Sequence, residues 1–181
     1  KISQLKQLID DSHNIVMITH VSPDGDALGS SLSLYWLLHD MGKNASVVVP
    51  NRFPEFLAWL PGSKDIVIAL DDNDLANKTI AEADLLCLLD FNTINRINWL
   101  KTPVGASKAR RILIDHHPNP DIECDVEISH PEISSTAELM YRIVSMAGTP
   151  YDHITKDIAE CIYTGMMTDT GNFSYNSQNP D

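Results

Sequence analysis

The chain is poor in cysteine and in long apolar runs, and each shortage excludes a class of protein. Its three cysteines, Cys87, Cys124 and Cys161, are odd in number and widely spaced, which indicates reduced thiols and excludes a disulfide framework. No apolar run approaches the ~18 residues that a membrane-spanning helix needs. Residues 1–14 contain no apolar segment typical of a secretory signal. We therefore expect a cytoplasmic protein with no membrane partner.

Basic residues are also scarce. The chain has 13 lysines and arginines against 25 aspartates and glutamates, which gives a formal net charge of −12. Proteins that bind long duplex DNA carry a basic surface, so we exclude that partner. Four basic residues, Lys101, Lys108, Arg110 and Arg111, gather in one stretch. They are either a solvated surface or a track for phosphate groups.

What the chain does have is four short acidic segments, each at the end of an apolar run. The segments are His20 with Asp24 and Asp26, then Asp90, then Asp115 with His116 and His117, and finally Asp169. Residues at the carboxyl ends of parallel strands meet at one edge of the sheet, where ligands bind in α/β proteins. We therefore expect these acidic and imidazole groups to share one cleft.

Carboxylates gathered in this way repel one another unless cations neutralise them. The simplest resolution is a pair of divalent metal ions. None of the four segments contains cysteine, which argues against a thiolate zinc site. A mixed set of carboxylates and imidazoles suits Mn²⁺, favoured by the imidazoles, with Mg²⁺ as the alternative. Two such ions lie roughly 3.5–4 Å apart when one carboxylate bridges them, and they activate a shared water to attack phosphorus.

In order, spacing and context, the four segments resemble motifs I to IV of the DHH phosphoesterases, and the resemblance spans residues 15–175. It implies that one metal is held by His20, Asp24 and Asp90. The second metal would be held by Asp26, Asp90, His116 and Asp169, so that Asp90 bridges the two ions.

The resemblance also implies roles beside the metals. His117 would contact the substrate phosphate or assist the leaving group, and Asp115 would orient an imidazole. The segment Ser134-Ser135-Thr136 resembles family members that cleave short oligoribonucleotides, 3′-phosphoadenosine 5′-phosphate or cyclic dinucleotides, so these three residues are candidate substrate contacts.

Those family members carry a second domain with a glycine-and-histidine motif that grips the substrate. No such motif follows Gly171. We therefore expect residues 1–181 to be a catalytic-domain fragment without that second domain. The oligomeric state stays open, with a homodimer as one alternative.

The apolar pattern predicts an α/β fold, namely a doubly wound, mainly parallel five-stranded sheet with helices on both faces. The expected strands are 14–20, 45–49, 66–70, 85–89 and 111–114. The expected helices are 2–12, 26–41, 54–60, 74–82, 134–146 and 155–167.

Each candidate site residue also has a structural interpretation. His20 could simply be a polar residue at a strand end, and Asp90 could cap a helix. Asp169 could be a turn residue before Gly171. Arg96, six residues beyond Asp90, faces either the site or the solvent.

Two further alternatives concern other motifs. Ser134, Ser135 and Thr136 with Glu138 are typical of a helix-capping cluster, as well as of a phosphate contact. An EF-hand starting at Asp24 would need Glu at its twelfth position, which is Tyr35. We interpret the remaining histidines, His13, His39, His130 and His153, as structural.

The sequence therefore predicts a metal-dependent phosphoesterase whose substrates are short RNA or DNA oligonucleotides or small nucleotides. Two alternatives stay open: a pyrophosphatase or polyphosphatase with the same metals, and a regulatory domain that binds metal or nucleotide without turnover.

Overall fold

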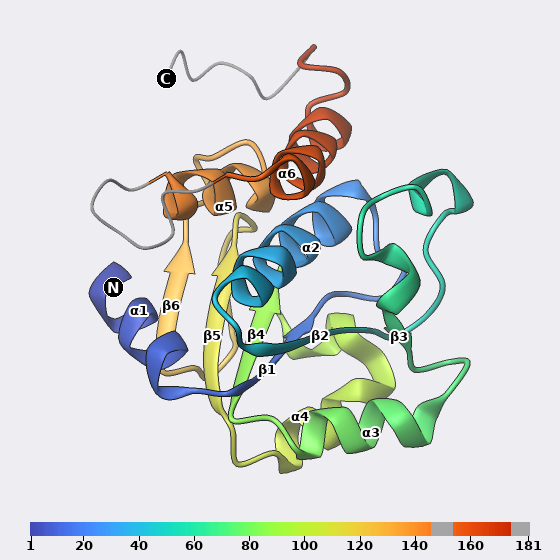
Figure 1. Ribbon diagram of the computed structural model, residues 1–181, viewed down its shortest axis with the longest axis vertical. Coiled ribbons are helices and arrows are strands. Elements are labelled where there is room, and N and C mark those ends of the chain that lie inside the picture. The colour runs from blue at the N-terminus through green and yellow to red at the C-terminus, as the bar shows by residue number, and fades with distance from the viewer. Residues whose placement is uncertain (146–153, 175–181) are drawn as a thin grey trace.

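A single parallel sheet organises the molecule. The computed structural model describes residues 1–145 and 154–174. Its six strands are hydrogen-bonded in the order β3-β2-β1-β4-β5-β6, and every pair is parallel (Figure 1). The strands are β1 (Asn14–Ile18), β2 (Asn44–Val49), β3 (Val67–Ile68), β4 (Leu85–Leu89), β5 (Arg110–Asp115) and β6 (Val126–Ser129). The predicted doubly wound α/β class is confirmed, but the predicted count of five strands is wrong because β6 was not anticipated.

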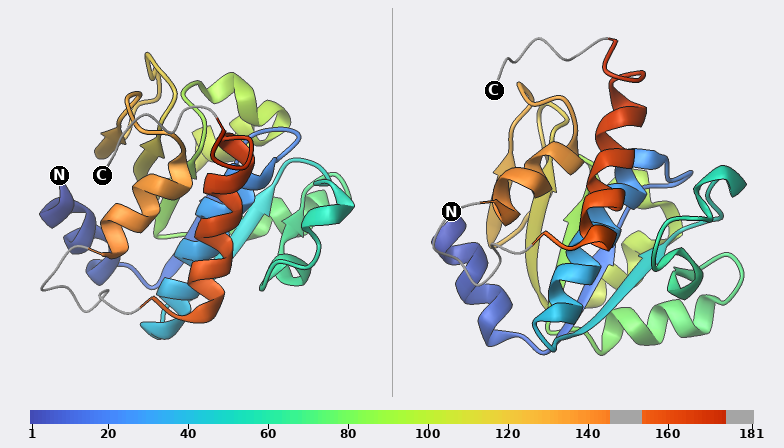
Figure 2. Two further views of the ribbon diagram at one scale, coloured as in Figure 1. Left: turned by 90° about the horizontal axis from the view of Figure 1, so that it is seen from above. Right: turned by 45° about the horizontal axis from the view of Figure 1, so that its top comes forward.

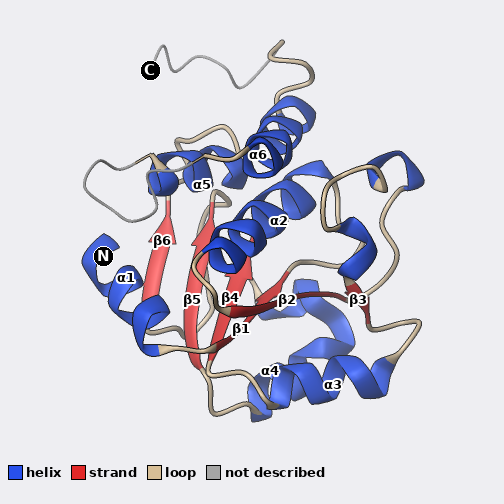
Figure 3. Ribbon diagram, in the orientation of Figure 1, coloured by secondary structure: helices blue, strands red, loops and turns tan. Residues whose placement is uncertain are grey.

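Helices cover both faces of this sheet, as Figure 3 shows. One face carries α1 (Ile2–Asp11), α2 (Gly25–Asp40), α5 (Thr136–Val144) and α6 (Lys156–Asp169). The other face carries α3 (Asn73–Ala81), α4 (Lys101–Ala106) and the 3₁₀ helix η3 (Ile94–Leu100). Two short 3₁₀ helices, η1 (Glu55–Leu57) and η2 (Ser63–Asp65), connect β2 to β3. No helix within the described residues is long and apolar enough to cross a membrane.

The central strands are largely apolar where both of their faces are buried. Along β1, Ile15 and Met17 belong to the core under α2, whereas Val16 and Ile18 belong to the core under α3. All five residues of β4 are fully buried. Alternate side chains of a strand point to opposite faces, so a sheet covered twice needs such unbroken apolar runs.

Two glycines let α6 approach its neighbours closely. A Cβ atom at Gly29 of α2 would lie 2.5 Å from the Cys161 carbonyl oxygen of α6. A Cβ atom at Gly165 of α6 would lie 2.5 Å from the Cβ of Ala137 in α5. Figure 2 shows α6 lying against α2 and α5. This close packing fixes where the last residue of α6, Asp169, lies relative to the sheet.

Most predicted helices form within a few residues of their expected bounds. The helix expected at 155–167 extends to Asp169, and the one expected at 134–146 begins at Thr136; its expected end, Met146, lies outside the described residues. The 3₁₀ helix η3 and helix α4 were not predicted. Asp24 caps α2 by accepting hydrogen bonds from the backbone N–H groups of Asp26 and Ala27, both at 3.0 Å.

Candidate metal centre

The candidate site lies at the carboxyl ends of three adjacent strands. His20 follows β1, Asp90 follows β4, and His116 and His117 follow β5, and these strands are neighbours in the order β1-β4-β5. The chain order reverses at β1, because β2 lies on its other side. This reversal is the switch point at which α/β sheets open a crevice for ligands.

The first ligand group comprises His20, Asp24 and Asp90, whose ligand atoms all lie within 4.8 Å of one another. Nδ1 of His20 lies 2.8 Å from the Val21 carbonyl oxygen, which can only accept, so Nδ1 carries the proton. Nε2 therefore presents a lone pair, 3.4 Å from Asp90 Oδ2 and 3.9 Å from Asp24 Oδ2. This nitrogen is buried and has no hydrogen-bond partner. A cation coordinated by Nε2 and the two carboxylates would satisfy it.

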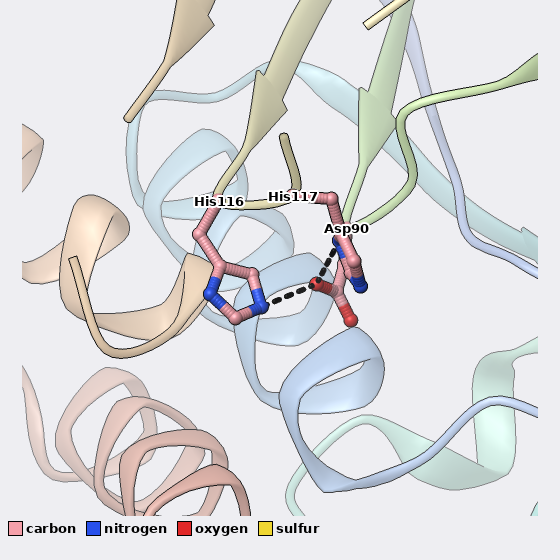
Figure 4. Close-up of side chains that lie close together, drawn as sticks. All are labelled: Asp90, His116 and His117. Carbon is pink, nitrogen blue, oxygen red and sulfur yellow. Dashed lines mark ion pairs between the residues drawn. The ribbon is translucent and has the colours of Figure 1, made fainter. Parts of the chain in front are cut away.

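The second group comprises Asp26, His116 and Asp169. Nδ1 of His116 faces the Ile133 carbonyl oxygen at 3.3 Å, so Nε2 again turns its lone pair toward the acids. Nε2 lies 3.3 Å from Asp169 Oδ2, 3.8 Å from Asp26 Oδ2 and 3.7 Å from Asp90 Oδ1. Asp90 thus borders both groups, and Figure 4 shows its carboxylate between the rings of His116 and His117.

In the part of the chain that the structure describes, the acidic side chains of these groups lie close together without lysine or arginine partners. Within the described residues, every ion-pair partner of Asp24, Asp26, Asp90 and Asp169 is a histidine. Burial, followed by repulsion from Asp90 and Asp169, raises the pKa of Asp26 well above its usual value. Burial, followed by repulsion from Asp24, does the same to the pKa of Asp90. Such an arrangement favours bound cations, which would restore the charge balance.

The N-terminus of α5 fixes two of these carboxylates. The backbone N–H groups of Thr136 and Ala137 donate to the two oxygens of Asp26 at 2.7 and 2.8 Å. The first N–H groups of a helix have no partner within the helix and favour a negative charge. The Thr136 hydroxyl donates to Asp90 Oδ1 at 2.9 Å. The first turn of α5 therefore positions the carboxylates of Asp26 and Asp90 close to each other.

The backbone at Asp90 is strained. Its φ angle is 66°, in the left-handed region that non-glycine residues rarely adopt. Asp90 does not cap the helix that follows it, because the N-cap of η3 is Thr93. The N–H of Asp90 donates to the Ile114 carbonyl oxygen at 3.1 Å. Asp169 is the final residue of α6 and lies neither in a turn nor at a strand end. The cluster is thus supplied by three strand ends, the start of α2 and the end of α6.

His117 has a different environment from the other two histidines. Its Nδ1 lies 2.8 Å from Asp115 Oδ1, and its Nε2 lies 2.9 Å from Nη1 of Arg96. Asp115 is fully buried and contacts this imidazole, not those of His20 or His116. The Arg96 side chain therefore faces the site, an alternative that the sequence left open.

The cluster of Ser134, Ser135 and Thr136 chiefly serves the start of α5. Ser135 Oγ accepts from the Glu138 N–H at 3.0 Å, and Ser134 donates from its N–H and hydroxyl to Glu138 Oε2. Ser135 and Thr136 are fully buried. Of the three, Ser134 keeps partly exposed surface, and the substrate contacts predicted for Ser134, Ser135 and Thr136 remain predictions.

The remaining candidates lie elsewhere. Arg110 pairs with Asp125 at 2.6 Å and Arg111 donates to the Val104 carbonyl oxygen, both at the start of β5 and hence at the opposite edge of the sheet. This position favours a solvated surface over a phosphate track. His13, His39 and His130 are exposed, and His153 lies outside the described residues.

The donor set fits hard divalent ions. It consists of carboxylate oxygens and imidazole nitrogens, with a buried orphan nitrogen at its centre and one carboxylate bordering both groups. The buried thiol of Cys87 has a pKa raised by burial to about 12 and is not among these donors. The fit therefore agrees with Mn²⁺ or Mg²⁺ and not with a thiolate metal site.

Several known proteins are similar to this chain. The model of the DHH family N-terminal domain matches residues 14–166. The bifunctional oligoribonuclease and PAP phosphatase NrnA of Thermus thermophilus is 33% identical over 167 residues, covering 92% of this chain and 46% of the relative. The Bacillus subtilis protein of the same name is 28% identical, covering 96% of this chain and 51% of the relative.

A solved structure, described as an exopolyphosphatase-related protein from Bacteroides fragilis, superposes with a TM-score of 0.95 at 51% identity. That match covers 99% of this chain and 52% of the solved one. The chain therefore spans about half the length of the curated relatives that it matches.

Proposed function

The chain belongs to the DHH family, and on that premise we propose that it is the metal-binding catalytic domain of a phosphoesterase. The observation that carries the proposal is the position of Asp90. Its two oxygens border two ligand groups, and each group contains an imidazole nitrogen with its lone pair turned inward. A bridging carboxylate between two such groups is the donor arrangement of two-metal hydrolases.

We assign the ligands residue by residue. His20, Asp24 and Asp90 would hold one ion, and Asp26, Asp90, His116 and Asp169 would hold the other. When bound, two divalent ions supply positive charge and acidify water for attack on phosphorus. Imidazole donors favour Mn²⁺ over Mg²⁺ in both groups.

The chain's own residues would organise the reaction around those ions. The start of α5 holds the carboxylates of Asp26 and Asp90 before any substrate arrives, which limits reorganisation during catalysis. Arg96 and His117 form a polar side of the site. Positioning and electrostatic stabilisation of this kind supply most of the acceleration in phosphoryl transfer.

For the substrate we propose a short oligoribonucleotide or a small nucleotide. The two curated relatives described above are named oligoribonuclease and PAP phosphatase, which supports this class. The net charge of −12 also supports it, because a long polyanion needs an extended basic surface. Hydrolysis of pyrophosphate or polyphosphate is a second candidate, favoured by the name of the Bacteroides fragilis protein at 51% identity.

The test combines metal binding with product release. Isothermal titration of Mn²⁺ into the metal-free chain should give two ions per chain, and Asp90→Ala should lose binding at both positions. With Mn²⁺ present, the chain is incubated with 3′-phosphoadenosine 5′-phosphate, a ribodinucleotide, cyclic di-AMP and pyrophosphate.

The proposal would be supported if product is released from a nucleotide substrate, and if this activity is lost in Asp90→Ala but retained in the exposed control Asp40→Asn. Release from pyrophosphate alone would favour the second candidate. Metal binding without release from any substrate would favour a regulatory domain.

A further inference from the structure

Arg96 lies in η3 and connects two loops of the site. Its carbonyl oxygen accepts a hydrogen bond from the Val21 N–H at 2.8 Å, next to His20 in the loop after β1. Its guanidinium reaches the loop after β5, where Nη1 lies 2.9 Å from Nε2 of His117. Arg96 therefore connects the loop after β1, 75 residues earlier at Val21, with the loop after β5, 21 residues later at His117.

The contacts on both sides of the His117 ring define its protonation. A guanidinium can only donate, so Nε2 of His117 accepts and carries no proton. The carboxylate of Asp115 accepts, so Nδ1 carries the proton. Both ring nitrogens are therefore engaged, which leaves His117 neither a lone pair for a metal ion nor a proton on Nε2 for a leaving group.

Arg96 also differs from the other arginines. Arg52, Arg110 and Arg142 each pair with a carboxylate, and Arg111 donates to a backbone carbonyl. Within the described residues, Arg96 makes no ion pair with a carboxylate, although it borders the acidic cluster. One of its five N–H groups is directed at His117. The planar arrangement of the others matches two oxygens of one phosphate group.

We propose that Arg96 binds the non-bridging oxygens of the substrate phosphate and, through the same guanidinium, positions His117. The inference rests on the proposed phosphoesterase function and adds the residue that recognises the reacting group. It assigns phosphate recognition to the guanidinium in place of the imidazole, since the imidazole is already saturated by Asp115 and Arg96.

The first test is kinetic. With Mn²⁺ and the nucleotide that the chain hydrolyses, Arg96→Ala should lower kcat/KM on the order of 10- to 100-fold, mainly through KM, as expected for the loss of charge-assisted hydrogen bonds. Arg96→Lys keeps the charge but loses the planar fork, so its KM should lie between those of Arg96→Ala and the parent. The control Arg52→Ala removes an exposed cation that pairs with Asp71 and should leave both constants unchanged.

The second test does not need turnover. In the ¹⁵N NMR spectrum of the metal-free protein, His117 should show a protonated Nδ1 and an unprotonated, hydrogen-bonded Nε2, and Arg96→Ala should shift the Nε2 signal. Titration of inorganic phosphate into the Mn²⁺-loaded protein should show at least tenfold weaker binding for Arg96→Ala than for Arg52→Ala.

The outcomes separate the two proposals. Unchanged KM and unchanged phosphate affinity in Arg96→Ala would overturn phosphate recognition, and an unchanged Nε2 signal would overturn the positioning of His117. If the parent hydrolyses nothing yet loses phosphate affinity on Arg96→Ala, the proposed function fails while this inference stands.

Discussion

Asp90→Asn should stabilise the metal-free protein while it destroys the metal centre. The amide has the shape of the carboxyl group but no charge. Its oxygen would still accept from the Thr136 hydroxyl, which now lies 2.9 Å from Asp90 Oδ1. Its nitrogen would donate to Nε2 of His20, which lies 3.4 Å from Asp90 Oδ2 and has no hydrogen-bond partner.

The size of the gain in stability follows from two unfavourable features of the metal-free protein that Asp90→Asn removes. An unsatisfied buried polar atom such as His20 Nε2 costs about 1–3 kcal/mol. The pKa of Asp90 is raised well above its usual value, first by burial and then by repulsion from Asp24, so its ionised form opposes folding at neutral pH. We therefore expect a gain of at least about 1–3 kcal/mol in the free energy of unfolding. At about 2–4 °C per kcal/mol for a domain of this size, Tm should rise by roughly 2–12 °C.

Thermal unfolding followed by circular dichroism tests this expectation at pH 7.5, first with EDTA and then with excess MnCl₂. In EDTA, Asp90→Asn should unfold at a higher temperature than the parent. With Mn²⁺ the parent should gain stability by binding the ions, whereas Asp90→Asn should not. A lower Tm for Asp90→Asn in EDTA, or equal stabilisation of both proteins by Mn²⁺, would refute the reasoning.

Three further predictions follow from the same packing. The raised pKa of Asp26 means that the folded state binds its proton more tightly than the unfolded state. In urea unfolding of the metal-free protein, ionisation of this carboxyl should therefore lower the stability as pH rises above about 4, the usual carboxyl pKa. Gly165→Ala would place a Cβ 2.5 Å from α5 and should lose about 1–3 kcal/mol, whereas Gly105→Ala, with no atom within 4 Å, should lose none in the same assay. Ser135→Ala removes the N-cap of α5 and should cost about 1 kcal/mol by urea unfolding.

The sheet was largely predictable because its central strands are marked by composition alone. β4 is an unbroken apolar run, β1 and β5 contain the apolar runs Ile15–Ile18 and Ile112–Ile114, and a polar residue directly follows each run. β6 was missed because only Val126 and Ile128 are apolar within its four residues, a signal too short to separate from a loop. Helix α4 was missed because Pro103 and Gly105 lie within its six residues, and both residue types weaken a helical pattern.

Part of the candidate ligand set was also accessible to sequence reasoning, since His20, Asp90 and His116 lie at or just after the ends of predicted strands. The contacts that hold these ligands in place could not be predicted from the sequence. That Thr136 holds Asp90 depends on a contact between residues 46 positions apart, and that Arg96 meets His117 depends on the path of η3. Asp169 lies beside His116 because glycines let α6 pack closely, which no local pattern reveals.

The charges of the two buried aspartates, Asp26 and Asp90, are offset to different degrees by hydrogen-bond donors. Asp26 accepts from two backbone N–H groups at the start of α5, and both bonds lower its pKa against the effect of burial. Asp90 accepts from a single hydroxyl, and its other oxygen faces a lone pair on His20. A helix start already offsets part of the charge of Asp26, whereas the charge of Asp90 lacks a comparable partner. Neutralising Asp90, by an amide or by cations, should therefore stabilise the fold more than neutralising Asp26.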